Sequence, residues 1–140
     1  MGALETDLDP RKYIGLSFPL RADNNNDFAL TKTSLQQSQH NLKNLLLTFP
    51  GERVHQPVFG SRLRALCFEQ TDDNLPTRIE EEIRRSVSHW LPYINIIEVA
   101  TLTEEGDTNK IFVTIKYSTA LNTQSLEQIT LDASYTATRY

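Results

Sequence analysis

Cysteine is nearly absent from this sequence of 140 residues, which contains only Cys67. An intrachain disulfide and a cysteine-rich metal site are therefore both excluded. Cys67 lies between Leu66 and Phe68, and this apolar setting favours a buried, unreactive thiol over a nucleophile. The sequence also lacks an apolar run near the roughly 20 residues that a membrane-spanning helix needs. Its acidic N-terminus is too polar for a signal peptide, so we expect no membrane contact.

A surplus of basic residues is missing as well. Fourteen Lys and Arg residues stand against eighteen Asp and Glu residues, and the net charge is −4. Proteins that neutralise phosphates usually carry a basic surplus, so this charge argues against nucleic acid as a partner. Arg62, Arg64, Arg84 and Arg85 could form a small basic face. Solvated helix surfaces paired with nearby glutamates explain these arginines more simply, and a nucleic-acid-associated domain stays open only as an alternative.

Residues that could bind a metal or a cofactor do not converge in the sequence. The three histidines are spread over different expected elements, without the regular spacing of metal ligands. The segment Asp23-Asn24-Asn25-Asn26-Asp27 begins like a calcium loop. However, Phe28 stands where that loop needs glycine, and Ser34 stands where it needs an acidic residue. No glycine-rich phosphate loop occurs either, so the sequence predicts no metal and no cofactor.

A glycosidase needs two carboxylates facing each other across a cleft, so carboxylates in expected loops and helix ends are the candidates for catalysis. The candidates are Glu52, Glu69, Asp72 and Asp73. The last three lie where one expected helix ends and the next is capped, which explains them without chemistry. Nothing in the sequence supplies the apolar pocket that raises the pKa of a catalytic carboxyl group. We therefore predict no catalytic residues, and a lysozyme-like cell-wall hydrolase remains the alternative.

The length and the hydrophobic periodicity predict one α+β domain. Residues 1–12 are interpreted as a flexible lead-in, and residues 13–140 as a single domain. Apolar residues alternate from Tyr13 to Leu20, which predicts a strand, and Pro19 confines this strand to the edge of a sheet. A second short strand is expected at residues 28–31.

Three helices are expected in the middle of the chain. The first begins at Ser34, which could form a capping box with Gln37. A short helix follows from Ser61, and a longer one runs from Asn74 until Pro92 stops it. The apolar stripe of this long helix consists of Leu75, Ile79, Ile83, Val87 and Trp90.

The remaining segment is expected to form a mainly antiparallel sheet. Residues 94–99 are apolar without clean alternation, which predicts a bulge or burial on both faces. After a turn at residues 104–109, residues 111–117 alternate regularly between apolar and polar side chains, which is the clearest strand pattern in the chain. A last strand is expected around residues 128–133. The predicted fold thus has short N-terminal strands, about three helices and a C-terminal sheet.

One stretch of the chain carries motifs of a known family. The segment Asn44–Val54 is followed by Pro57-Val58-Phe59-Gly60, and Trp90 precedes a proline corner. In this order the motifs resemble the GPW/gene-25-like family, the baseplate wedge proteins of contractile-tailed (T4-type) phages, with members in type VI secretion baseplates. The resemblance spans residues 13–133. The motif residues, which we expect to be structural, are Gly51, Glu52, Arg53, Val54, Pro57, Phe59 and Gly60.

The resemblance implies a structural, non-catalytic subunit of the virion, assembled in the host cytoplasm and located in the tail baseplate. The implied partners are the larger wedge proteins, which form a helical core bundle, and the tail sheath subunit. Tail tube or hub proteins are further candidate partners, whereas nucleic acid and membrane are not. The family members serve as the platform on which the tail sheath starts.

The resemblance also points to two sites. Docking on the core bundle is assigned to Leu91, Pro92 and Tyr93, where family members commonly carry Glu-Pro-Arg. The proline is kept but both charges are missing, so we expect apolar and aromatic contact there. Strand addition by the sheath is hypothesised at the last strand, because no proline or run of like charge blocks its edge. This strand comprises Gln128, Ile129, Thr130, Leu131, Asp132 and Ala133.

Overall fold

The computed structural model describes residues 7–9, 11–18, 20–69, 72–103 and 111–132. Its elements are β1 (Gly15–Leu16), β2 (Leu30–Thr31), α2 (Ser34–Leu47), α3 (Leu63–Cys67), α4 (Leu75–Trp90), β3 (Ile94–Thr103), β4 (Ile111–Thr119) and β5 (Asn122–Asp132). This order confirms the predicted α+β fold, with short N-terminal strands, three helices and an antiparallel C-terminal sheet. Within the described ranges, no helix combines the length and the apolar character needed to cross a bilayer.

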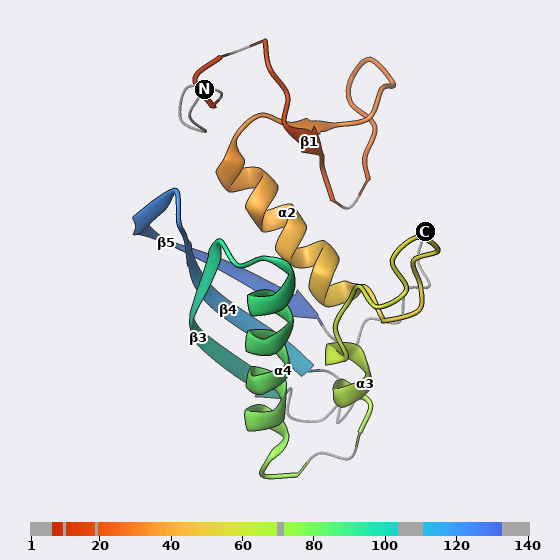
Figure 1. Ribbon diagram of the computed structural model, residues 1–140, viewed down its shortest axis with the longest axis vertical. Helices are drawn as coiled ribbons and strands as arrows, with labels where there is room; N and C mark the ends of the chain where they lie inside the picture. The colour runs from red at the N-terminus through yellow and green to blue at the C-terminus, as the bar shows by residue number, and fades with distance from the viewer. Residues whose placement is uncertain (1–6, 10, 19, 70–71, 104–110, 133–140) are drawn as a thin grey trace.

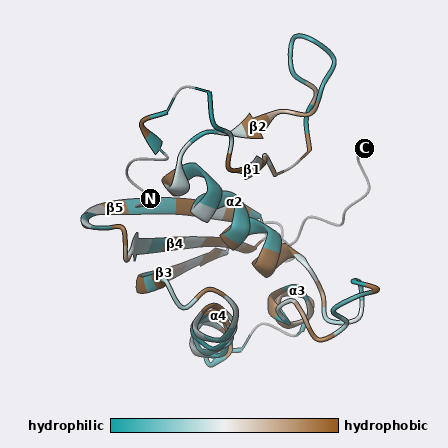
Figure 2. Cartoon of the chain, turned by 45° about the horizontal axis from the view of Figure 1, so that its top comes forward, coloured by the Kyte–Doolittle hydropathy of each residue, from teal (hydrophilic) through white to brown (hydrophobic). Residues whose placement is uncertain are grey.

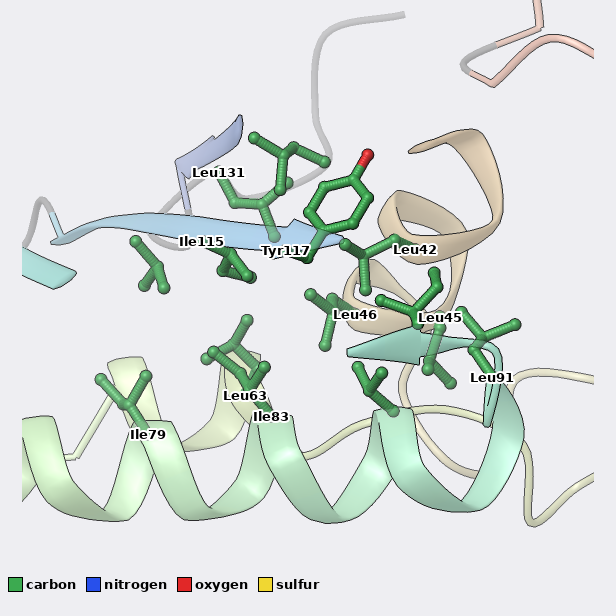
Figure 3. Close-up of a cluster of buried hydrophobic side chains, with 14 of the residues drawn as sticks. Leu42, Leu45, Leu46, Leu63, Ile79, Ile83, Leu91, Ile115, Tyr117 and Leu131 are labelled. Carbon is green, nitrogen blue, oxygen red and sulfur yellow. The ribbon is translucent and has the colours of Figure 1, made fainter. Parts of the chain in front are cut away.

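The three helices pack on one side of the antiparallel sheet β3–β4–β5, and the short hairpin β1–β2 lies beyond the N-terminal end of α2 (Figures 1 and 2). Figure 3 shows how the core forms between these layers, with side chains from the sheet facing those from all three helices. The buried residues labelled there are Leu42, Leu45, Leu46, Leu63, Ile79, Ile83, Leu91, Ile115, Tyr117 and Leu131. One apolar core therefore joins every element from α2 to β5.

Strand β4 is the central strand because β3 and β5 pair with it on either side, and its alternating sequence points every second side chain into this core. Ile111, Val113, Ile115 and Tyr117 are all buried, as the periodicity predicts. Strand β3 pairs with β4 on one side, with a register shift between Ile96 and Glu98, which confirms the predicted bulge. Strand β5 pairs with β4 on the other side and is therefore an edge of the sheet formed by the described residues.

The apolar stripe of α4 is buried as predicted, except that Trp90 at its end is only partly covered. Cys67 is buried in α3, and desolvation raises the pKa of its thiol to about 11. A thiol with such a pKa stays protonated and unreactive near neutral pH. Both observations agree with the interpretation of these side chains as core residues.

The predicted N-cap of α2 is displaced by one residue. The N-cap is Thr33, whose side-chain oxygen accepts a hydrogen bond from the Gln36 amide at 3.2 Å. Ser34 is already helical, and both its amide and its hydroxyl donate to Asp7 Oδ1 at 2.9 Å. The sequences Thr33-x-x-Gln36 and Ser34-x-x-Gln37 fit the capping rule equally well. The side chain of Ser34 is bound to Asp7, which is distant in sequence, and Thr33 is the residue that caps the helix.

The predicted N-terminal strand is much shorter than its alternating sequence indicates. Only Gly15–Leu16 pairs with Leu30–Thr31, while Pro19 lies outside the described residues. Ile14, Leu16 and Leu20 are exposed, so the alternating apolar face does not reach the core. The physical reason is that the hairpin pairs with no third strand among the described residues, and two strands alone bury neither face.

Candidate functional site

The family motif forms a closed loop between α2 and α3. The Ser61 amide donates to the Thr48 carbonyl at 2.9 Å, so the two ends of the loop meet. Within the loop, the Gly51 amide donates to the Pro57 carbonyl at 2.6 Å. Gly51 and Gly60 have φ angles of 101° and 132°, which residues with a side chain rarely adopt. The two glycines of the motif therefore fit this backbone conformation.

The motif side chains fasten the loop to the helices. Glu52 forms an ion pair with Arg64 of α3 at 3.7 Å. The Arg53 guanidinium lies 3.9 Å from the centroid of the Phe59 ring, in a cation–π arrangement. The buried Phe59 ring meets Trp90 of α4 edge-on, with 5.0 Å between the ring centroids. These contacts give structural roles to the glutamate, the arginine and the phenylalanine of the motif.

Three of the four carboxylates named as catalytic candidates, Glu52, Glu69 and Asp72, are engaged in local structure. Glu52 is held by Arg64, and Glu69 receives a hydrogen bond from Arg78 at 2.5 Å. Asp72 accepts from the Asn74 amide at 3.1 Å, just before α4 begins. Within the described ranges, no three His, Cys, Asp or Glu residues are grouped so that they could hold a metal ion. The geometry thus offers structural explanations for Glu52, Glu69 and Asp72.

The sequence interpretation missed Glu82, the carboxylate with the most elaborate surroundings. Its side chain is 10% exposed and accepts hydrogen bonds from the Arg62 amide at 2.8 Å and from Arg85 at 2.5 Å. Burial by itself would raise the pKa of Glu82, but the Arg62 amide and the Arg85 guanidinium outweigh it, so this pKa is lowered. Glu82 thereby links α4 to the start of α3.

The predicted core-bundle corner is only partly at the surface. Leu91 is buried in the core, whereas Pro92 is exposed. Tyr93 is half-buried, and its hydroxyl oxygen accepts a hydrogen bond from Asn41 of α2 at 3.0 Å. A cavity of about 310 Å³ lies beside the corner, lined by Pro92 and by Ile94 at the start of β3. A partner reaching this corner would contact Pro92 and the exposed part of Tyr93.

The predicted sheath strand is the edge strand β5. Its Glu127–Asp132 segment pairs with β4 without interruption. Gln128 and Thr130 are exposed, whereas Ile129 and Leu131 are 2% and 4% exposed and belong to the core. Ala133, the last residue of the hypothesised site, lies outside the described residues. Only part of this site can therefore offer side chains to a partner, and the rest of any contact must come from the main chain.

The opposite edge, β3, is interrupted. Its bulge falls between Ile96 and Glu98. At this point Arg84 of α4 donates hydrogen bonds to the carbonyl oxygens of Ile96 and Ile97, at 2.8 and 3.3 Å. Glu80 holds the same guanidinium at 2.8 Å. The pairing of β4 with β5 also has a register shift, between Tyr117 and Thr119 of β4. The two edges therefore differ mainly in the two carbonyl groups of β3 that Arg84 binds, because these are not available to another strand.

The family of the chain follows from its sequence. The model of the family "Baseplate wedge protein gp25" matches residues 33–124, which is more than half of the chain. This chain belongs to the gp25 baseplate wedge family. The match covers the motif loop, the corner and all three helices but not the hairpin β1–β2, which precedes residue 33. No curated protein sequence matches the chain.

Solved structures share the fold of this gp25-family chain. A chain of the anti-feeding prophage (AFP) baseplate matches with a TM-score of 0.66 and 22% identity, covering 78% of this chain and 86% of that one. A putative tail lysozyme from Geobacter sulfurreducens matches with a TM-score of 0.62 and 22% identity, covering 73% and 92%. A chain of the postcontracted pyocin R2 baseplate matches with a TM-score of 0.55 and 19% identity, covering 71% and 97%.

Family membership confirms the resemblance found in the sequence. The chain is a structural protein of the contractile-tail baseplate, and the tail baseplate is its location. The residues that contact its partners remain predictions.

Proposed function

We propose that this gp25-family protein docks on the core bundle of the larger wedge proteins and starts the tail sheath. Docking uses the Pro92–Tyr93 corner, and the sheath adds a strand to the free edge of β5. The observation that carries the sheath proposal is the difference between the two sheet edges. Each edge strand has one register shift against β4, but on β3 Arg84 binds the carbonyl oxygens of Ile96 and Ile97 at the bulge, whereas the Glu127–Asp132 segment of β5 is paired continuously.

The surroundings of β5 favour pairing through the main chain. An edge strand presents a row of N–H and C=O groups that point away from its own sheet, and a partner strand can bond to them. Among the described residues, no strand pairs with the outer side of β5. The exposed side chains of Gln128 and Thr130 are uncharged, so they do not repel an approaching strand. A sheath segment in extended conformation is therefore a fitting partner for this edge.

The test of the sheath proposal replaces Glu127 and Gln128 with proline, one at a time. Neighbouring N–H groups in a strand point to opposite sides, so one proline removes a bond to β4 and the other removes a donor from the free edge. The edge variant should fold and enter baseplates normally, yet give sharply fewer sheathed tails. Thermal melting identifies the edge variant, and electron microscopy counts baseplates and sheathed tails.

The control is Gln128→Ala, which changes an exposed side chain and keeps the main chain intact. It should support normal sheath. Normal sheath from the folded proline variant would contradict the proposal and move the sheath contact away from β5. Deleting residues 127–140 would be less informative, since Ile129 and Leu131 are core residues and the shortened sheet would lose part of its core.

Docking at the corner is tested by Pro92→Asp. The added carboxylate would be buried without a partner in an apolar contact, so we expect the protein to be lost from purified wedges. Thr77→Asp is the control, because it adds the same charge at an exposed position in the first turns of α4. Docking of the unmodified protein should depend little on salt. The corner has Leu91 and Tyr93 where family members commonly carry Glu and Arg, so it has no charged side chains whose attraction to a partner salt would screen.

Co-purification with wedges at increasing salt measures both effects. If Pro92→Asp protein remains in wedges as well as Thr77→Asp protein does, the corner is not the docking site. A steep loss of the unmodified protein with salt would show that charged groups elsewhere carry the docking.

The alternative, a cell-wall hydrolase, has one point in its favour. The fold is shared with a protein called a putative tail lysozyme. A shared fold does not carry an activity, and in this chain Glu52, Glu69 and Asp72 hold local structure. The structural role therefore has the stronger support.

A further inference from the structure

A cavity that belongs to neither of the two sites above lies between the motif loop, the start of α3 and the C-terminal half of α4. Its volume is about 410 Å³. The side chains that matter most in its lining are those of Val58, Arg62, Glu82, Arg85, His89 and Trp90. The family motif thus builds one wall of a cavity whose other walls are helices, so the cavity depends on the loop conformation set by Gly51 and Gly60.

The charge of the cavity is opposite to that of the whole chain. Two arginines and one glutamate line it, whereas the chain has a net charge of −4. The carboxylate of Glu82 is already engaged by Arg85 and by the Arg62 amide. The structure shows no ion pair for the Arg62 guanidinium with any other described residue, and Arg62 is exposed. The cavity therefore offers a cation to a ligand and no unpaired anion.

The same cavity exposes apolar surface from a loop that is held firmly. Val58, which lines the cavity, is 73% exposed. Trp90 is partly covered, with its ring against the buried Phe59. A loop that is already ordered lowers the entropic cost of binding. Trp and Arg, both present in the lining, are among the residue types enriched at the energetically dominant positions of interfaces.

We propose that this cavity is a docking site for an acidic, amphipathic segment of another baseplate protein. An apolar side chain of the segment enters between Val58 and Trp90, and a neighbouring carboxylate pairs with Arg62. The inference rests on membership of the baseplate family and on the complementary charge. It is independent of strand addition at β5 and of docking at the Pro92 corner.

The test places a photo-crosslinking amino acid at Val58 in assembled baseplates and identifies the captured segment by mass spectrometry. We expect one segment that carries apolar residues and a net negative charge. Arg62→Glu should lower the crosslinking yield about tenfold, because reversing a charge at an interface opposes an acidic partner. Arg21→Glu is the matched control, since it changes the net charge equally at an exposed position of the N-terminal hairpin. It should leave the yield unchanged.

A second variant separates binding from folding. Arg62→Gln removes the charge without placing a new carboxylate near Glu82, and its melting temperature should match that of the unmodified protein. Its crosslinking yield should fall between those of the unmodified protein and Arg62→Glu. In addition, Trp90 is the only tryptophan in the chain, so its fluorescence should respond when the captured segment is added as a synthetic peptide.

Four outcomes would overturn the inference: capture of a segment without acidic residues, capture of nucleic acid, no capture at all, or capture that folded Arg62 variants leave unchanged. If baseplates that carry the crosslinker assemble normal sheath without any capture, the proposed docking site in the cavity is wrong, whereas the proposals for β5 and for the Pro92 corner are unaffected. A failure of the β5 proposal would instead appear as normal sheath in the folded proline variant.

Discussion

Replacing Gly60 with alanine should lower the free energy of unfolding by about 2–5 kcal/mol. This is the largest effect that we expect from a single added methyl group. Two costs add up to this loss of stability. Alanine at a positive φ costs roughly 1–2 kcal/mol, and overpacking adds typically about 1–3 kcal/mol. Gly60 has a φ of 132°, and a Cβ there would lie 2.4 Å from the Thr48 carbonyl oxygen. That oxygen already accepts the Ser61 amide, so it cannot move freely.

Gly51→Ala separates the two costs. Gly51 also has a positive φ, but a Cβ there would meet no other atom within 4 Å. This variant should therefore lose only the conformational part, roughly 1–2 kcal/mol. Denaturant unfolding of the two variants measures the difference. Equal losses would mean that the loop relaxes around the new methyl group, and that the close approach of Gly60 to Thr48 is not rigid.

Ile83→Ala should cost roughly 2–5 kcal/mol, because it removes a branched side chain from a filled core and leaves a cavity. Ile83 is completely buried, and it lies in the middle of the α4 stripe facing the sheet (Figure 3). The cost should lie towards the upper end if α4 cannot move closer to the sheet. Two contacts restrain such a movement, the bonds of Arg84 to the β3 bulge and those of Glu82 to the start of α3.

Ser88→Ala is the control for Ile83→Ala. Ser88 is exposed on the same helix, and substitutions at such surface positions usually change stability by less than about 0.5 kcal/mol. Thermal and denaturant unfolding of both variants gives the comparison. A loss below about 1 kcal/mol for Ile83→Ala would show that α4 collapses onto the cavity, and that its ties to the sheet and to α3 are weaker than the contacts suggest.

For the motif loop, the short sequence pattern predicts the loop itself but not the cavity beside it. The glycines and the proline of Gly51–Gly60 predict a turn-rich loop, and its likeness to the gp25 family was visible in the sequence. The cavity beside the loop was not visible, because it needs Trp90 and Arg85 from a helix that begins at Leu75. No local pattern contains the relative position of the loop and that helix.

Glu82 shows the same limit on the scale of single side chains. Glu80, Glu81 and Glu82 are consecutive and chemically alike, so nothing in the local sequence distinguishes them. Glu82 acquires its buried position from the Arg62 amide, which is 20 residues away in the chain. Glu80 binds Arg84 in a helical i,i+4 pair instead. The sequence alone could predict the i,i+4 pair but not the long-range contact.

The sequence by itself determined the fold class, the α4 stripe, the central strand β4 and the family. These follow from periodicity and from short motifs, because burial of one face of a helix or strand leaves a repeating pattern whatever the partner is. Only the tertiary structure decided that Leu91 turns into the core, that the N-terminal apolar residues stay exposed, and that Arg84 occupies the β3 edge. Each of these depends on contacts between segments far apart in the chain, which no local pattern encodes.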